Sequence, residues 1–299
     1  MSIAAALGML SSACPSQQSL GWQGSVDRAA RMTPEARIVV IDVRTGRLLA
    51  AHHFAEAART LAAPGSTLKP LVLYGMVAAG RWNPSRRVAC DRQLMVAGHR
   101  LACSHPLAPP FDAREALTWS CNSYFAAVAR TLQPGELGRL LRPTGLLNVT
   151  GLTATNGAAP DEAAADFREP VNADTAQLAL LGVQGVRVTP LELAVAYHWL
   201  ALQLEAHPDT EAARVVRAGL EDSASFGMAG EASLGGVPVA GKTGTAESTA
   251  SSRTHGWFVG IAPADKMQVV VAIYLPTGRG ADAAHLAGEL LANAQPERP

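Results

Sequence analysis

The sequence predicts an α+β domain in which strands and helices occupy different stretches of the chain. A hairpin pattern comes first, helical patterns fill the middle, and three strand patterns followed by one helix end the chain. Runs of strands separated from runs of helices favour an α+β arrangement over a doubly wound parallel sheet. The 299 residues are 48% hydrophobic and 17% charged, a composition that supports a large core and excludes a disordered chain.

The first hairpin is expected over residues 36–53. From Ala36 the chain reads ARIVVIDV, then Arg44-Thr45-Gly46, then RLLAAHH. Two apolar runs around a short glycine-containing turn are typical of paired antiparallel strands. We therefore place the start of the folded domain at residue 36.

Helical patterns dominate the middle of the chain. The segment STLKPLVLYGMVAAG is an apolar helix pattern closed by Gly80, with Pro70 in the first turn, where its missing N–H costs little. Asp112 and Glu115 have the spacing of a capping box, which predicts a helical region through residue 130. Residues 133–170 are rich in Pro, Gly, Thr and Ala and are expected to be connections.

A further helix and a final group of strands follow. Thr189 and Glu192 repeat the capping-box spacing around Pro190, which predicts a helix over about 190–204. The runs VPVAGKTGTAE, HGWFVGIAP and MQVVVAIYLP are strand-like and are separated by polar turns. The segment AAHLAGELLANA has apolar residues at spacings of three and four and predicts a closing helix.

The N-terminus suggests export. Residues 1–14, MSIAAALGMLSSAC, have an apolar stretch followed by small residues, as an export signal has, although the first basic residue is only Arg28. An ordinary apolar N-terminus is the alternative. We treat 1–14 as a possible export signal, 15–35 as a leader segment and 36–299 as the domain. No apolar run reaches the 18 or more residues of a spanning helix.

The charge balance bears on partners. Lys+Arg and Asp+Glu are both 25, so the basic excess of a nucleic-acid-binding protein is absent and no nucleic-acid partner is expected. Only three of the 25 basic residues are lysines: Lys69, Lys242 and Lys266. Because this chain uses arginine for almost all of its positive charge, a lysine within a motif indicates a specific chemical role.

The first motif that carries chemistry is Ser66-Thr67-Leu68-Lys69. Serine and lysine three residues apart on a helix share one face, within hydrogen-bond reach. A serine hydroxyl becomes a good nucleophile when a neighbouring base takes its proton. Lysine can be that base only when neutral, which requires burial or a nearby positive charge to lower its pKa.

Two further motifs complete the set. Ser120-Cys121-Asn122 is uninformative alone, and a helix N-cap at Ser120 is the simpler interpretation. Lys242-Thr243-Gly244-Thr245 lies on a predicted strand, where Gly244 allows close approach by another backbone or a ligand. The lysine and the threonine hydroxyls offer a cation and donors, as a substrate carboxylate requires.

In this order the three motifs resemble the signature S-x-x-K, S-x-N, K-T-G of penicillin-binding proteins and serine β-lactamases. The surrounding segments APGSTLKP, SCNSYF and VAGKTGTAE are similar to those of a penicillin-binding transpeptidase domain, and the likeness extends over about residues 36–295. The resemblance implies a β-lactamase/transpeptidase-like fold, in which an antiparallel sheet with flanking helices meets a helical lobe at the active site.

The resemblance also implies a role for each motif residue. Ser66 attacks the carbonyl of the penultimate D-Ala of a peptidoglycan stem peptide and forms an acyl-enzyme, while Lys69 accepts the proton of Ser66. Ser120 passes a proton towards the leaving amine and is kept in place by Lys242. Asn122 binds the substrate amide and helps to orient Lys69.

The substrate-binding roles fall on the third motif. Thr243 and Thr245 would hold the terminal carboxylate, and Gly244 would allow the substrate to approach. The backbone N–H groups of Ser66 and Thr245 would form the oxyanion hole, where one donor is worth about a hundred- to a thousand-fold in rate. The implied function is a serine D,D-transpeptidase that works without a cofactor and is acylated by β-lactams.

Other functions are compatible with parts of the sequence. D,D-carboxypeptidase activity, β-lactam hydrolysis and a β-lactam sensor that acylates without turnover use the same motifs. Glu169-Pro170-Val171-Asn172 is similar to the loop of β-lactamases that carries a deacylating glutamate, but one residue shorter; a helix entry before Asp174 is the simpler interpretation. Residues 236–243 also satisfy the P-loop pattern, although they look like a strand and a polar loop follows.

The cysteines and histidines predict no metal site. No H-E-x-x-H or C-x-x-C spacing occurs. Cys90 and Cys103 flank a hairpin pattern that ends near His105, and whether they form a disulfide in an exported protein stays open. Cys121 is expected to be a small buried packing residue. The aromatic residues Trp119, Tyr124 and Phe125 have two interpretations, shaping of the substrate groove and core packing, of which core packing is the simpler.

The expected surroundings follow from the resemblance. The partners are peptidoglycan stem peptides and β-lactams, and the location is extracytoplasmic, in the periplasm or at the cell surface. The roughly 35 residues ahead of the first strand leave no room for a pedestal domain, so we expect a membrane-bound cell-wall protein to localise the chain.

Overall fold

The computed structural model describes residues 15–106, 109–247 and 253–294, with side chains from residue 21 onwards. Its centre is a five-stranded antiparallel sheet in the order β2-β1-β9-β8-β7. The strands are β1 (Arg37–Asp42), β2 (Leu48–His52), β7 (Ala240–Glu247), β8 (Thr254–Ala262) and β9 (Val269–Leu275). The hairpin and the three C-terminal strands were predicted, and all five pair as antiparallel neighbours.

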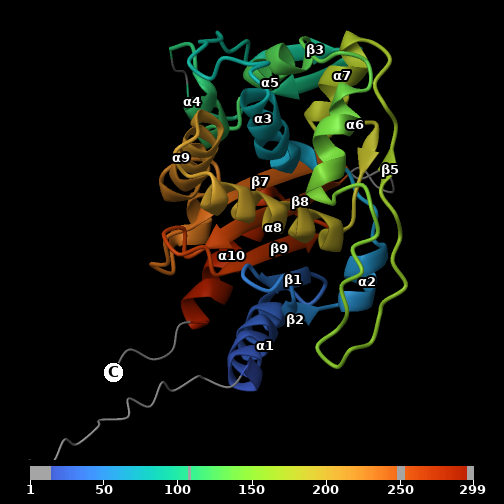
Figure 1. Ribbon diagram of the computed structural model, residues 1–299, viewed down its shortest axis with the longest axis vertical. Coiled ribbons are helices and arrows are strands. Elements are labelled where there is room, and N and C mark those ends of the chain that lie inside the picture. Colours follow the sequence, from blue (N-terminus) through green and yellow to red (C-terminus); the bar gives the residue numbers. More distant parts are fainter. Residues whose placement is uncertain (1–14, 107–108, 248–252, 295–299) are drawn as a thin grey trace, which may run out of the picture.

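Helices cover both faces of the sheet (Figure 1). One face carries α1 (Pro15–Met32) and α10 (Gly280–Asn293), and the other carries α8 (Pro190–Ala206). The alternation along β1 explains the two layers, because Ile38 and Val40 join the core under α1 and α10, whereas Val39 and Ile41 join the core under α8. Among the described residues, no helix has the length and hydrophobicity needed to cross a bilayer.

A helical lobe stands on the α8 side of the sheet, at the top of Figure 1. It contains the helices α3 (Lys69–Ala78), α4 (Ala113–Thr118), α5 (Asn122–Ala129), α6 (Glu136–Leu141), α7 (Ala173–Leu180) and α9 (Glu211–Ser225). The remaining elements are short. Beside the sheet lies α2 (Phe54–Arg59), and η3 (Gly230–Ser233) packs against α10. The others are η1 (Gly65–Leu68), η2 (Arg142–Thr144), β3 (Gln93–Val96), β4 (His99–Ala102), β5 (Asp166–Phe167) and β6 (Val186–Arg187).

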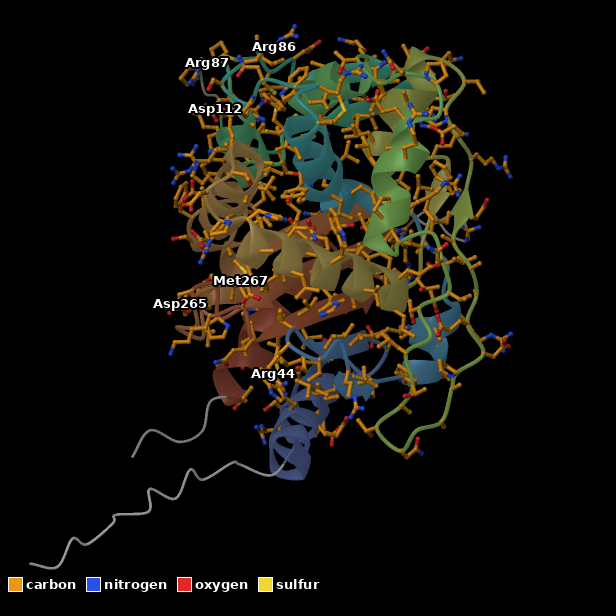
Figure 2. All side chains as sticks on the ribbon, viewed as in Figure 1. Arg44, Arg86, Arg87, Asp112, Asp265 and Met267 are labelled. Carbon is orange, nitrogen blue, oxygen red and sulfur yellow. The ribbon has the colours of Figure 1, made fainter. Side chains whose placement is uncertain are left out.

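Both predicted capping boxes form. Asp112 Oδ1 accepts from the N–H of Glu115 at 2.9 Å, and Glu115 Oε2 accepts from the N–H of Asp112 at 2.9 Å. Arg87 lies beside this cap, 2.9 Å from Glu115, at the far end of the lobe from α1 (Figure 2). Thr189 and Glu192 cap α8 in the same way, which fixes the start of the helix where the sequence predicts it.

Two expectations differ from the structure. Residues 133–170 contain α6, η2 and β5 as well as connections, because these short elements form against the lobe rather than through their own pattern. The expected leader segment 15–35 is mostly α1, which packs Val26 and Ala29 against the sheet. The packed body therefore begins ahead of residue 36, while residues 1–14 lie outside the described residues.

Candidate active site

The predicted nucleophile lies on a single turn of 3-10 helix. Ser66 is half-buried in η1, one residue after Gly65 and directly ahead of α3, so it is not on the α-helix that the sequence predicts. The Thr67 hydroxyl donates to the Pro64 carbonyl at 2.8 Å, and the Tyr197 hydroxyl donates to the Thr67 carbonyl at 2.9 Å. These bonds hold the backbone on both sides of Ser66 in one conformation.

Close backbone contacts hold the same turn from two further directions. The Gly65 N–H donates to the Gly182 carbonyl at 3.0 Å. A Cβ on Gly182 would meet Gly65, and a Cβ on Gly244 would meet the Pro64 carbonyl. The turn is thus wedged between α7 and strand β7, and only glycine fits at these contacts.

Lys69 is the best-connected residue of the site. Its side chain is fully buried at the start of α3, and Nζ donates to Asn122 Oδ1 at 2.7 Å, to the Ser120 carbonyl at 2.9 Å and to Ser120 Oγ at 3.3 Å. The three ammonium hydrogens thus have three acceptors. Residues of the first and second motifs, more than 50 positions apart, are in direct contact.

The environment shifts the pKa of both motif lysines. Burial lowers the pKa of Lys69 to about 8, against the opposing effect of the thiols of Cys103, Cys121 and Cys90. Burial, and then the charge of Lys69, holds the pKa of Lys242 well below its usual range. A lysine with a lowered pKa can act as a base near neutral pH.

The expected hydrogen bond between Ser66 and Lys69 is not formed. Among the hydrogen bonds of the described residues, none involves the Ser66 hydroxyl, because Lys69 points its three hydrogens at Ser120 and Asn122. Catalytic hydrogen bonds often tighten only when substrate is bound. Lys69 therefore has to exchange one of its acceptors for Ser66 during a reaction.

The second motif breaks the predicted helical region into α4 and α5. Ser120 is half-buried with φ of 54°, a left-handed conformation that is costly for a residue other than glycine. The N-cap of α5 is Cys121, so the N-cap interpretation of Ser120 is wrong. The strained turn directs the Ser120 hydroxyl and the Asn122 side chain to the same ammonium.

The third motif lies in β7, an edge strand of the sheet. Lys242 is fully buried, and its Nζ donates to the Thr243 carbonyl at 3.1 Å rather than to Ser120. Thr243 Oγ1 donates to the Met228 carbonyl at 3.4 Å, and Thr245 Oγ1 accepts from the Gly280 N–H at 2.9 Å. The P-loop alternative is wrong, because the strand continues through Glu247 and no helix N-terminus follows Lys242.

The candidate deacylating glutamate belongs to another part of the molecule. The Glu169 carboxylate accepts from the Gly138 N–H at 3.1 Å, and the residue lines a cavity of about 660 Å³ beside the end of β7. None of the predicted site residues lines that cavity. As the sequence suggested, the segment 170–172 enters a helix, with Asn172 as the N-cap of α7.

Several residues that support the site carry no signal in the sequence. His255 Nε2 and Trp257 Nε1 both bond to the Ala63 carbonyl, at 2.8 and 2.9 Å, and tie the segment ahead of Ser66 to β8. Burial lowers the pKa of His255, consistent with a neutral ring that donates to this carbonyl. Gly182 and Tyr197 likewise act through contacts that only the folded chain brings about.

Comparisons with known proteins agree with the fold. The family model described as the penicillin binding protein transpeptidase domain matches residues 36–294. No curated protein sequence matches the chain. Three solved structures are similar at 16–22% identity: the transpeptidase domain of Burkholderia pseudomallei penicillin-binding protein 3, Pseudomonas aeruginosa PBP2 in complex with WCK 5153, and Helicobacter pylori PBP2 in complex with MreC.

The overlap with these structures is extensive. The Burkholderia domain has 22% identity and a TM-score of 0.78, with 93% of each chain covered. The Pseudomonas protein has 20% identity and a TM-score of 0.74, covering 91% of this chain and 75% of that one. The Helicobacter protein has 16% identity and a TM-score of 0.75, covering 90% and 61%. The sheet with its helical lobe is therefore the fold of these domains.

Proposed function

Because the chain belongs to the penicillin-binding protein transpeptidase domain family, we propose that it is a serine D,D-transpeptidase of peptidoglycan synthesis. Its donor substrate would be a stem peptide ending in D-Ala-D-Ala, and β-lactams would acylate the same serine. The observation that carries the proposal is the contact of Lys69 with both Ser120 and Asn122, since it joins two of the three motifs around one buried amine.

The proposed reaction begins with the neutral form of Lys69. Its amine takes the proton of Ser66 Oγ as that oxygen attacks the carbonyl carbon of the penultimate D-Ala. The tetrahedral intermediate collapses when the C–N bond to the terminal D-Ala breaks, and Ser120 relays a proton to the leaving amine. An amine of a second stem peptide then attacks the ester carbonyl and gives up one proton; the C–O bond to Ser66 breaks, the crosslinking amide forms, and Ser66 Oγ takes up that proton.

Strand β7 would bind the donor peptide. An edge strand offers unpaired backbone N–H and C=O groups, to which an extended peptide can add as a further strand. Thr243 and Thr245 would hold the terminal carboxylate next to the buried amine of Lys242, and the bound carboxylate would favour the charged form of that lysine because an opposite charge nearby raises its pKa. The N–H groups of Ser66 and Thr245 would receive the oxyanion.

The site favours transfer over hydrolysis of the acyl group. A β-lactamase needs a general base that activates water beside the ester, and the glutamate that resembles such a base is bonded to Gly138. With this carboxylate engaged elsewhere, the ester would persist until an amine arrives. This supports transpeptidation over β-lactam turnover.

The proposed function also requires a location and a partner. Peptidoglycan is crosslinked outside the cytoplasm, so we propose an extracytoplasmic location. One similar structure is a PBP2 in complex with MreC, and by analogy we propose that a membrane-associated cell-wall protein positions this chain.

The first prediction concerns the nucleophile. Fluorescent penicillin should label the purified wild type in a one-to-one covalent adduct, and Ser66→Ala should abolish labelling because the proposed reaction places the ester on the Ser66 hydroxyl alone. Ser85→Ala is the matched control, since Ser85 is exposed and lies outside the three motifs. Intact mass spectrometry and in-gel fluorescence measure the adduct.

A peptide assay separates the related activities. Wild type incubated with a D-Ala-D-Ala peptide and an acceptor amine should form the amide product and release D-Ala. Release of D-Ala without the amide would identify a carboxypeptidase, and rapid nitrocefin turnover a β-lactamase. A stable penicillin adduct with no peptide reaction would identify a sensor. Folded wild type that takes no penicillin label would contradict the assignment altogether.

A further inference from the structure

Three cysteines and one histidine form a compact cluster next to the second motif. The donor atoms of Cys90, Cys103, His105 and Cys121 all lie within 4.8 Å of one another, and all but Cys90 are buried. All three cysteines are free thiols. Neither the reaction proposed above nor the fold needs this gathering of soft donors, so the cluster calls for its own explanation.

Three separate stretches of chain supply the cluster. Cys90 precedes β3 and Cys103 follows β4, and the pairing of Gln93 with Ala102 brings the two ends of this hairpin together. His105 comes from the segment after the hairpin, and Cys121 is the N-cap of α5. The spacing matches no short metal motif, so the sequence alone predicts no metal site here and only a packing role for Cys121.

The donors are oriented as metal ligands are. His105 Nδ1 bonds to the Pro106 carbonyl at 2.7 Å, which fixes the tautomer and leaves Nε2 facing Cys90 Sγ at 3.3 Å. Metal-binding histidines usually have such a partner on the second ring nitrogen. The Asn122 N–H donates to Cys103 Sγ at 3.2 Å, a bond that favours a thiolate.

We propose that Cys90, Cys103, His105 and Cys121 bind one zinc ion and thereby fix the turn that carries Ser120 and Asn122. Three thiolates and one imidazole are a donor set of structural, four-coordinate zinc sites. Zinc–sulfur bonds of about 2.3 Å in a tetrahedron place the donors roughly 3.8 Å apart, so the cluster needs to contract by only about 1 Å. The half-exposed Cys90 gives the ion a way in.

Zinc accounts for the cluster better than a disulfide. A Cys90–Cys103 bridge would leave the third thiol and the oriented histidine without a role, whereas a zinc ion uses all four groups.

The site is coupled to the candidate active site through the chain itself. Cys121 lies between Ser120, which has a strained backbone, and Asn122. Asn122 Nδ2 also donates to the carbonyls of Leu101 and Ala102 at 3.3 Å, so the same residue joins the hairpin to Lys69. A metal bond at Cys121 would therefore hold in place Ser120 and Asn122, the two residues that accept hydrogen bonds from Lys69.

The decisive measurement is the metal content of the full chain, purified without a metal-affinity tag. Inductively coupled plasma mass spectrometry should find about one zinc ion per chain in the wild type. Cys103→Ser and His105→Ala should lose it. Cys14→Ser, which changes none of the four proposed ligands, and His99→Ala, at an exposed histidine on β4, are matched controls that should keep it. Zinc content does not depend on catalytic activity, so this result is independent of the proposed function.

A second set of measurements on the wild type guards against variants that fail to fold. Cobalt(II) in place of zinc should give thiolate-to-cobalt charge-transfer bands and the intense d–d bands of a tetrahedral site. A chelator should lower the Tm, and added Zn²⁺, but not Mg²⁺, should restore it. The rate of penicillin acylation should fall by about tenfold or more on chelation and recover with zinc.

The opposite outcomes would overturn the inference. Wild type that takes up neither zinc nor cobalt, or that shows a Cys90–Cys103 disulfide by peptide mapping after zinc is offered, has no such site. Cys103→Ser and His105→Ala that retain as much zinc as the two controls would also refute it. Zinc binding with an unchanged acylation rate after chelation would contradict the positioning of the Ser120–Asn122 turn.

Discussion

At the residue scale, the proposed chemistry depends on Lys69, whose amine is shielded from water but still has hydrogen-bond acceptors. The three hydrogen bonds of Lys69 to Ser120 and Asn122 favour its charged form, whereas complete burial favours the neutral form. Burial has the larger effect, and the pKa falls to about 8. As an ammonium, Lys69 is held in position by its hydrogen bonds. Because its pKa is near neutral pH, it can still lose a proton and act as a base.

This pKa predicts a pH dependence of acylation. Below the pKa of about 8 the neutral fraction of Lys69 rises roughly tenfold per pH unit, so the second-order rate of penicillin acylation should rise from pH 6 and level off above about 8. The three thiols of the cluster raise the pKa of Lys69 against the larger effect of burial, and the charge of Lys69 in turn lowers the pKa of Lys242 on β7. Stopped-flow fluorescence across pH 6–10 measures the profile.

Two lysine-to-arginine variants test the assignment of the base. Lys69→Arg keeps a cation but cannot release its proton, so acylation should fall by about a hundredfold or more at every pH. Lys266→Arg makes the same change at an exposed lysine and should leave the rate unchanged. A flat profile between pH 6 and 9, or an active Lys69→Arg, would exclude Lys69 as the base.

At the scale of elements, the position of Ser66 depends on close packing of its turn. The turn η1 lies against β7 on one side and against Gly182, after α7, on the other. Nothing larger than a hydrogen fits at Gly182, whose φ is +68° and whose Cβ would meet the Gly65 backbone. The nucleophile is thus positioned by elements that are far apart in sequence.

Gly182→Ala should therefore displace the nucleophile. We expect the acylation rate to fall by roughly tenfold or more, because a shift of about 1 Å in a reacting group is costly. Gly80→Ala separates this effect from backbone strain, since Gly80 has a similar φ of +65° but open space around its Cβ position. It should cost about 1–2 kcal/mol in stability and leave the acylation rate unchanged. Equal acylation rates in the two variants would show that the close packing of Gly182 against Gly65 does not position Ser66.

At the scale of the whole molecule, helices must cover both faces of the sheet, because apolar side chains lie on both faces. Helix α1 covers the face opposite α8, and its Gln23 side chain bonds to the N–H and carbonyl of Ala51 on the edge strand β2. Val26 is fully buried in this contact. The helix is thus an integral layer that also protects an edge of the sheet.

Charging this contact should destabilise the fold without changing the chemistry. Val26→Asp places a carboxylate in an apolar layer and should cost about 3 kcal/mol or more, which lowers the Tm by roughly 6–12 °C. Arg31→Asp introduces the same residue on the exposed side of α1, in its last turn, where the unfavourable interaction with the helix dipole should cost only about 1 kcal/mol and lower the Tm by roughly 2–4 °C. Calorimetry measures both. Equal Tm values for the two variants would show that α1 does not contribute to the core.

Local patterns in the sequence predict much of the fold. The strand pairs of the hairpin and of β7–β9, the capping boxes at Asp112 and Thr189, and the break before Asn172 depend on residues within a few positions of one another. Short elements such as α6 and β5 were not predictable, because they are too short to be stable without the surfaces on which they lie.

What the sequence by itself determined was the α+β order of elements, the family, and the residues of the three motifs. What only the tertiary structure decided was how buried Lys69 and Lys242 are, which acceptors Lys69 selects, how tightly Gly182 closes on Gly65, and that four soft donors between Cys90 and Cys121 converge. The physical reason is that periodicity and capping are local, whereas desolvation, close approach and the gathering of ligands depend on which elements pack together.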